Sequence, residues 1–209
     1  MNIKQQIEST ERRIGPDDYP NRLVAFIDIL GFKAAVLKGG SSDRIEAIRK
    51  LDAGLQHVLK CLGIEGGDWY SARLFSDCIC ISADNSGSNL YYMLYELSFL
   101  QYYLACEHIL VRGGLSFGPH FENERMIFSE GLIQAYELEQ KANHPRILVD
   151  GHVQSLIRDE PGKYGENLRR FIKKSPDGVY FIDYLNFFWE QVYDLKISFG
   201  EVEEMLEPH

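Results

Sequence analysis

The sequence of 209 residues predicts one α+β domain with a βαββαβ core, the arrangement known as split βαβ or ferredoxin-like. Two observations predict it. Short apolar runs rich in β-branched residues alternate with longer segments of helical spacing. The second and third of these runs are separated by only Ser76 and Asp77, which is typical of a hairpin. This order favours a central, mostly antiparallel sheet with flanking helices, which we expect on one face of the sheet.

The first predicted strand, residues 22–30 (RLVAFIDIL), is too apolar for a surface position, so we expect it at the centre of the sheet. Residues 69–75 and 78–82 form the hairpin. Residues 109–117 (ILVRGGLSF) make another buried strand, whose two adjacent glycines indicate a close backbone approach, to a bulge or to a partner chain. An irregular stretch follows it. Shorter strands are expected at 146–149, 170–173 and 179–182.

Helical spacing fills the segments between the strands. Ser41, Ser42 and Asp43 are a typical N-terminal signal for a long helix over residues 44–62. Residues 90–107 carry many aromatic side chains, which we interpret as the face of a helix packed on the sheet. Further helices are expected at 32–37, 129–142, 152–158 and 184–192, with a polar loop at 161–166.

The domain organisation is expected to be simple. Residues 1–20 are polar, with a turn signal at 15–18, and we interpret them as an N-terminal leader. Residues 21–209 then form a single domain, because neither a repeat nor a low-complexity tract divides them. The four cysteines lack zinc-site spacing, so we expect reduced core residues. They are Cys61, Cys78, Cys80 and Cys106.

Composition and charge exclude several classes of function. The formal net charge of −9 argues against a nucleic-acid binder, which needs a broad basic face. No apolar run approaches the roughly 20 residues that cross a bilayer, and the first residues lack the apolar core of a signal peptide. We therefore expect a cytoplasmic protein with no membrane partner. A nucleoside triphosphate remains possible as a ligand, because a divalent cation supplies the positive charge that it needs.

Asp28 and Asp77 are the candidate metal ligands. Asp28 ends an otherwise apolar strand, and Asp77 lies in the turn of the following hairpin. In the split βαβ order the first and third strands are neighbours, so both carboxylates reach the same edge of the sheet. Two adjacent carboxylates are costly unless a cation lies between them, and oxygen ligands suit Mg²⁺ or Mn²⁺. The alternative is that Asp28 caps the next helix and Asp77 fills a turn position.

Five segments together resemble the class III nucleotide cyclases. Residues 26–32 (FIDILGF) resemble the first metal motif, F-x-D-I-x-G-F. Residues 73–77 (RLFSD) resemble the second, in which a base-reading lysine precedes the metal aspartate by four positions. Residues 111–118 (VRGGLSFG) resemble the R-x-G-x-x-x-G strand. Residues 129–139 (SEGLIQAYELE) resemble the G-x-x-V-N-x-A-x-R-L-E helix, and 146–150 (RILVD) resemble the strand after it. The order and spacing of all five agree with the family.

The resemblance covers residues 22–155 and implies a cyclase-like catalytic domain, with 156–209 packed on it or completing a dimer interface. It implies that Asp28, Asp77 and the backbone carbonyl of Ile29 hold two divalent cations, Mn²⁺ or Mg²⁺. The ribose 3′-hydroxyl would then attack the α-phosphorus and release pyrophosphate. It also implies a head-to-tail homodimer with two composite sites.

The candidate substrate-binding residues lie next to these motifs. They are Phe26, Gly31, Phe32 and Arg73. Glycine at position 31 and the open backbone after it would let amide groups approach the β- and γ-phosphates.

Four positions depart from the purine cyclases. Arg73 replaces the base-reading lysine, and Met126 falls near the second base-reading position. Ile133 or Gln134 replaces the ribose-contacting asparagine, and Glu137 aligns with the transition-state arginine. This set resembles the pyrimidine cyclases of bacterial Pycsar anti-phage systems, whose cyclic UMP or cyclic CMP activates an effector. A planar guanidinium donates well to pyrimidine carbonyls, and uracil has two where cytosine has one, so UTP is favoured over CTP.

Another cation must replace the missing arginine, and three are candidates. Arg112 is favoured over Lys141 and Arg146. The alternatives are an acidic helix partner for Arg112, a solvated Lys141, and pairing of Arg146 with Glu139. Two other functions stay open: a purine cyclase, or a degenerate cyclase fold that binds a nucleotide or partner without turnover.

Overall fold

The computed structural model describes residues 15–38, 40–63, 70–86 and 88–194. The first 14 residues of the leader, residues 64–69 with the first residue of the predicted hairpin, and the last 15 residues lie outside these ranges. The predicted turn at 15–18 is a short 3₁₀ helix, Pro16–Asp18, in which the Asp18 amide donates to the Gly15 carbonyl at 3.0 Å. Within the described residues no helix is long and apolar enough to cross a membrane.

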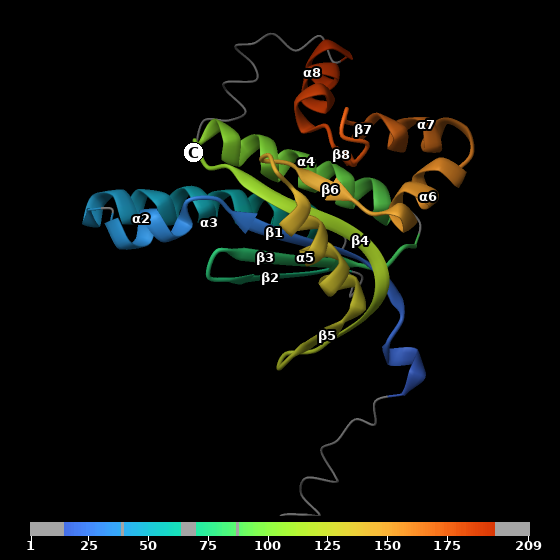
Figure 1. Ribbon diagram of the computed structural model, residues 1–209, viewed down its shortest axis with the longest axis horizontal. Coiled ribbons are helices and arrows are strands. Elements are labelled where there is room, and N and C mark those ends of the chain that lie inside the picture. Colours follow the sequence, from blue (N-terminus) through green and yellow to red (C-terminus); the bar gives the residue numbers. More distant parts are fainter. Residues whose placement is uncertain (1–14, 39, 64–69, 87, 195–209) are drawn as a thin grey trace, which may run out of the picture.

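The central sheet has eight strands, in the order β2-β3-β1-β4-β6-β8-β7, with β5 paired to β4 (Figure 1). β1 pairs antiparallel with β3 and with β4, and the β4–β6 pair is parallel. The predicted neighbours, the first and third strands, are therefore adjacent. The strands are β1 (Asn21–Ile29), β2 (Tyr70–Phe75), β3 (Cys78–Ala83), β4 (Val111–Glu122), β5 (Ile127–Ser129), β6 (Ile147–Val149), β7 (Ile172–Lys174) and β8 (Tyr180–Ile182).

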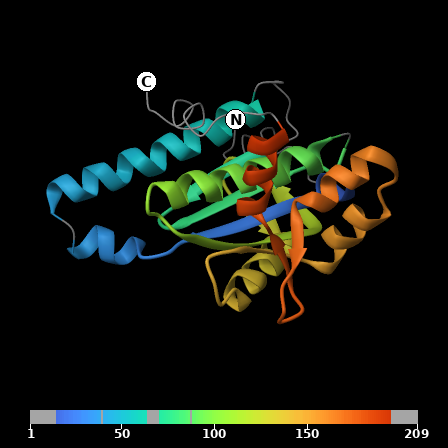
Figure 2. The same ribbon diagram turned by 90° about the horizontal axis from the view of Figure 1, so that it is seen from above.

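The helices cover both faces of the sheet, which corrects the expectation of one covered face. Leu23, Ala25 and Ile27 of β1 are completely buried in the main core, beneath α4. The alternate β1 residues point the other way, and there α5 packs on Val24 and Phe26. Figure 2 shows α3 and α4 above the sheet and α5 below it. The helices are α2 (Phe32–Lys38), α3 (Ser41–Gly63), α4 (Asn89–Cys106), α5 (Glu130–Lys141), α6 (Gly151–Asp159), α7 (Gly162–Arg170) and α8 (Tyr184–Asp194).

Two further expectations are corrected. The predicted loop at 161–166 is the start of α7, which has few apolar residues and buries Leu168. The stretch after residue 117 is not irregular, because β4 continues to Glu122 and returns as β5 in a hairpin. This hairpin projects beyond the sheet (Figure 1).

The two glycines of β4 bring the chain's own backbone together. A Cβ atom on Gly113 would lie 2.5 Å from the Phe26 carbonyl oxygen. One on Gly114 would lie 2.2 Å from the Ala135 carbonyl oxygen of α5. The close approach is therefore to β1 and α5 of the same chain, and it holds α5 against the strand that carries Asp28.

We expect Gly114→Ala to lower the free energy of unfolding by about 2 kcal/mol, since backbone must shift to admit the methyl group. Gly151→Ala is the matched control, because no atom lies within 4 Å of the position of its Cβ. Urea unfolding measures both. Equal stability of the two variants would contradict the close packing of α5 on β4.

Candidate metal and nucleotide site

Asp28 and Asp77 come together at one end of β1. Asp28 lies opposite Cys78 in the β1–β3 ladder, and Asp77 precedes Cys78 in the tight β2–β3 turn. Ser76 of this turn has a φ of 59°, the left-handed conformation that tight turns use. The Ile29 amide donates to the Asp77 carbonyl oxygen at 2.8 Å, so the turn is fastened to the strand end. Local pairing therefore fixes the separation of the two carboxylates.

A third side chain joins the two carboxylates. Oxygen atoms of Asp28 and Asp77 and the sulfur of Cys78 all lie within 4.8 Å of one another, and each side chain is half-buried. The Cys78 thiol donates to Asp77 Oδ1 at 3.7 Å. Burial, and then the charges of Asp77 and Asp28, raise the pKa of this thiol to about 11. Two carboxylates in this geometry fit a hard divalent cation, and a thiol adds a softer ligand that Mn²⁺ tolerates better than Mg²⁺.

Arg112 contacts the first of these carboxylates. It lies opposite Asp28 in the β1–β4 ladder, and its Nε is 3.4 Å from Asp28 Oδ2. The same guanidinium forms an ion pair with Glu139 of α5, whose side chain is buried. Arg112 thus bridges a helix carboxylate and a candidate metal ligand. The acidic helix partner considered above is present, and direct contact of Arg112 with a substrate stays a prediction.

We expect Arg112→Met to lower the free energy of unfolding by about 2 kcal/mol, because it leaves the Glu139 carboxylate buried without its cation. Arg112→Met combined with Glu139→Leu is expected to recover most of that loss, since no buried charge remains. Thermal unfolding of the two variants decides the point. A double variant as unstable as the sum of both single changes would contradict the bridge.

The other two candidate cations lie elsewhere. Arg146 does not pair with Glu139: its guanidinium donates to Asp177 Oδ2 at 2.6 Å and to Ser175 Oγ at 3.0 Å. It therefore fastens the β7–β8 turn. Lys141 is exposed at the end of α5, which agrees with the solvated alternative. Glu137, at the position of the family's arginine, is also exposed on α5.

Arg73 belongs to a polar cluster that also contains Glu122 and His120. It forms an ion pair with Glu122 and donates to the carbonyl oxygen of Asn123. Glu122 also accepts from Ser71 Oγ at 2.6 Å and from Ser82 Oγ at 3.2 Å, and His120 Nε2 lies 3.1 Å from it. Burial opposes ionisation of Glu122, but the hydrogen bonds from His120, Ser71 and Arg73 together outweigh it and lower its pKa to about 2.

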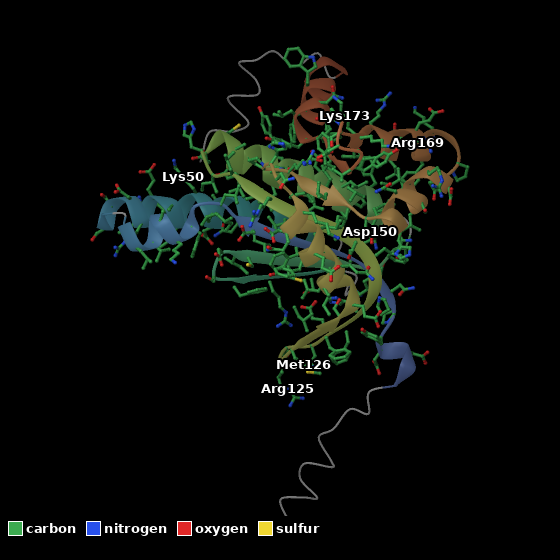
Figure 3. The ribbon with its side chains drawn as sticks, in the orientation of Figure 1. Lys50, Arg125, Met126, Asp150, Arg169 and Lys173 are labelled. Carbon is green, nitrogen blue, oxygen red and sulfur yellow. The ribbon has the colours of Figure 1, made fainter. Side chains whose placement is uncertain are left out.

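This polar cluster lines a cavity of about 390 Å³. The cavity also touches Arg22 at the beginning of β1, whereas Asp28 lies near the end of that strand and is not part of the lining. Arg73 is therefore directed to the β4–β5 hairpin and away from the metal candidates of its own chain. Met126 lies at the tip of that hairpin, next to Arg125 (Figure 3).

The remaining substrate candidates flank Asp28 along the chain. Phe26 is almost buried, with its ring 5.5 Å from the ring of Tyr136 of α5 in an edge-on contact. Gly31 has a φ of 81°, and no atom lies within 4 Å of the position that a Cβ would take. Phe32 begins α2 and packs partly against the core. The backbone at Gly31 is therefore open to a ligand.

The comparisons agree with this fold. No protein-family model and no curated protein matches the sequence. Among solved structures, the adenylyl cyclase CyaB from P. aeruginosa aligns with a TM-score of 0.51 and 16% identity, over 78% of this chain and 94% of that one. The catalytic core of a rhodopsin-guanylyl cyclase with converted specificity, in complex with ATPαS, aligns with a TM-score of 0.53 and 14% identity, over 78% and 95%.

These similarities establish the fold: the chain has the α+β architecture of class III nucleotide cyclase domains, with a central mostly antiparallel sheet and flanking helices. The predicted fold class is confirmed.

Proposed function

We propose that the protein is a nucleotide cyclase, which converts a nucleoside triphosphate to the 3′,5′-cyclic nucleotide and pyrophosphate. One observation carries the proposal: in a domain with the cyclase fold, Asp28 of β1 and Asp77 of the β2–β3 turn converge until their oxygens lie within 4.8 Å. A pair of this kind gains most from binding cations, because like charges at such a distance oppose one another. The alternative of a helix cap and a turn residue gives no reason for the convergence.

Divalent cations would be held by Asp28, Asp77 and the Ile29 carbonyl, with Cys78 beside them. When bound, they lower the pKa of the attacking 3′-hydroxyl and stabilise the departing pyrophosphate. Asp28 is oriented by Arg112, whose Nε lies 3.4 Å from Asp28 Oδ2. The open backbone at Gly31 is available to donate amide groups to the β- and γ-phosphates. Phe26 holds the strand in place through its contact with Tyr136.

The preferred substrate in this proposal is UTP, with CTP second. Arg73 at the polar cavity has a planar set of donors that suits pyrimidine carbonyls. Glu122 orients that guanidinium and supplies a carboxylate as a hydrogen-bond acceptor in the same cavity, whereas Met126 supplies no such acceptor. The cyclic product would serve as a second messenger in anti-phage defence and activate a separate effector.

A homodimer with composite sites completes the proposal. Within one chain Arg73 is directed away from Asp28, so a single site that uses both needs a second copy. Exposed apolar side chains on β2, the β4–β5 hairpin and α5 are suited to such an interface. They are Phe75, Met126, Phe128, Ile133 and Tyr136, each 47% to 65% exposed.

The alternatives keep specific support. The similar guanylyl cyclase core was solved with an ATP analogue, so a purine substrate is equally compatible with the fold. Glu137 at the position of the arginine favours a domain that binds a nucleotide without turnover. Against the second alternative, a binding module would gain little from the two adjacent carboxylates.

The experiment is to incubate purified protein with ATP, GTP, CTP and UTP in Mn²⁺ and to identify cyclic products by mass spectrometry. Cyclic UMP or cyclic CMP is the expected product, and light scattering is expected to show twice the 24.1 kDa chain mass. Cyclic AMP or cyclic GMP would reject the role of Arg73 in pyrimidine recognition. A dimer that forms no cyclic product from any substrate would favour the non-catalytic alternative.

A further inference from the structure

A second cavity, of about 440 Å³, lies where β1 leads into α2. The loop after Asp28, the helices α2 and α3, and the segment before β4 enclose it. Its lining is mostly apolar and includes Phe32, Val36, Ile48, Leu51 and Ile109. The cavity is separate from the polar cluster around Glu122, because the two have no lining residue in common.

Several side chains at this cavity are unusually exposed for their type. Val36 is 44% exposed and Ile48 is 64% exposed, although both face a concave surface. Apolar side chains around a hollow of roughly 300–1,000 Å³ are typical of small-molecule sites, whereas protein interfaces are usually flatter and larger. The shape therefore favours a small ligand with an apolar body.

Two polar side chains specify the other end of the ligand. Arg44 and His108 both line the cavity. Arg44 forms no ion pair with any residue in the described part of the chain, although Lys50 on the same helix pairs with Glu46 at 3.0 Å and with Glu107 at 3.2 Å. His108 follows the end of α4 with a φ of 62°, the left-handed conformation that commonly ends a helix, and it lines the cavity from there. A guanidinium in the lining of a mostly apolar cavity complements an anionic group, and the imidazole adds a second polar contact.

We propose that this cavity binds a soluble amphiphile with an aliphatic body and one carboxylate, such as a medium-chain fatty acid. The aliphatic chain lies among Val36, Ile48 and Leu51, and the carboxylate pairs with Arg44, with His108 a second polar residue of the lining. The proposal of this ligand does not rest on the proposed cyclase activity, although Gly31 and Phe32 line the cavity and are also candidate substrate-binding residues.

The cavity is coupled to the candidate metal site through the backbone. Ile29 lines the cavity, and its amide donates to the Asp77 carbonyl oxygen at 2.8 Å. The next amide, that of Leu30, donates to the Leu110 carbonyl oxygen at 2.9 Å. A ligand packed against this loop therefore acts on the residues that hold Asp28 beside Asp77. Its regulatory effect rests on the proposed function.

Calorimetric titration of the full chain with sodium dodecanoate, below its micelle concentration, tests the binding. One saturable site is expected, and each methylene removed from the acid should weaken binding roughly fourfold. Arg44→Gln should weaken it roughly tenfold, through loss of a charge-assisted hydrogen bond. Arg49→Gln on the same helix is the matched control and should bind normally, because Arg49 does not line the cavity. Ile48→Asp should abolish binding.

Three results would overturn the proposal. The first is that dodecanoate shows no saturable binding to the unmodified protein, whether or not the protein adsorbs to anionic lipid vesicles. The second is undiminished binding by Ile48→Asp, which would place the acid elsewhere. The third is that dodecanol, which lacks the carboxylate, binds as tightly as dodecanoate. Arg44 would then have no role in recognising an anionic group. Binding that follows the expected pattern in a protein without cyclase activity would support this site and reject only the proposed function.

Discussion

Asp77→Asn is expected to reduce nucleotide cyclisation by about 10³-fold, the largest effect of any single change considered. The substitution keeps the shape of the side chain and its turn, but it removes the charge that holds a divalent cation beside Asp28. Rates of product formation at saturating Mn²⁺ measure the effect. Asp28→Asn is expected to reduce the rate of cyclisation by a similar factor, since both carboxylates belong to one metal centre.

The same variant should fold at least as well as the unmodified protein. Without bound metal, Asp28 and Asp77 are like charges within 4.8 Å, so removal of one relieves repulsion. Asp52→Asn makes the same substitution on the exposed side of α3 and is therefore the matched control variant. An active Asp77→Asn protein, or one that is inactive only because it is unfolded, would contradict the role of this residue.

Glu122→Gln is expected to lower the free energy of unfolding at pH 7 by about 3 kcal/mol. The pKa of Glu122 is lowered from 4.5 to about 2, and this shift corresponds to about 3 kcal/mol of folding free energy in favour of the ionised carboxylate. Glutamine keeps the size of the side chain but loses the ion pair with Arg73 and the charge-assisted bonds from Ser71 and Ser82.

The pH dependence follows from the direction of the shift. Because the folded pKa is depressed, this stabilisation is complete above about pH 4.5 and is lost as the pH falls towards about 2. The difference between the unmodified protein and Glu122→Gln should therefore narrow to zero over that interval. Urea unfolding at a series of pH values measures it. Glu124→Gln, on the exposed part of the same hairpin, should show no such dependence.

Sequence patterns predicted the central strands correctly because burial on both faces leaves a continuous apolar run. Residues 22–30 contain one interior charge, and the strand β1 lies at the centre of the sheet. The helix α7 escaped prediction for the opposite reason. Its segment GKYGENLRR offers a single buried apolar side chain, Leu168, so no periodicity is visible.

The convergence of Asp28 and Asp77 followed from topology alone, since a hairpin next to the first strand brings its turn to that strand's end. Glu122 and His120 were missed because the strand was ended at residue 117, before a segment that contains glycine and proline. Had it been extended, strict alternation from Arg112 would have placed both on the same face as Asp28.

The sequence indicated an acidic helix partner for Arg112 as one alternative, but it did not identify which residues form the ion pairs. Glu139 pairs with Arg112 and not with Arg146, because α5 packs directly against β4. Arg146 instead meets Asp177, which is 31 residues away in the β7–β8 turn. Such partners depend on how layers pack in three dimensions, and residue spacing carries no information about it. The position of Cys78 beside both carboxylates, unlike these ion pairs, could have been predicted, because Cys78 directly follows Asp77 in the sequence.

Binding of Mn²⁺ is the most direct test of the central claim, that Asp28 and Asp77 form a divalent-metal centre. Electron paramagnetic resonance reports free Mn²⁺ during titration of the unmodified protein, Asp28→Asn, Asp77→Asn and the control Asp52→Asn. Saturable binding is expected in the unmodified protein and in the control, and its loss is expected in both site variants. Equal Mn²⁺ binding by all four folded proteins would contradict the account.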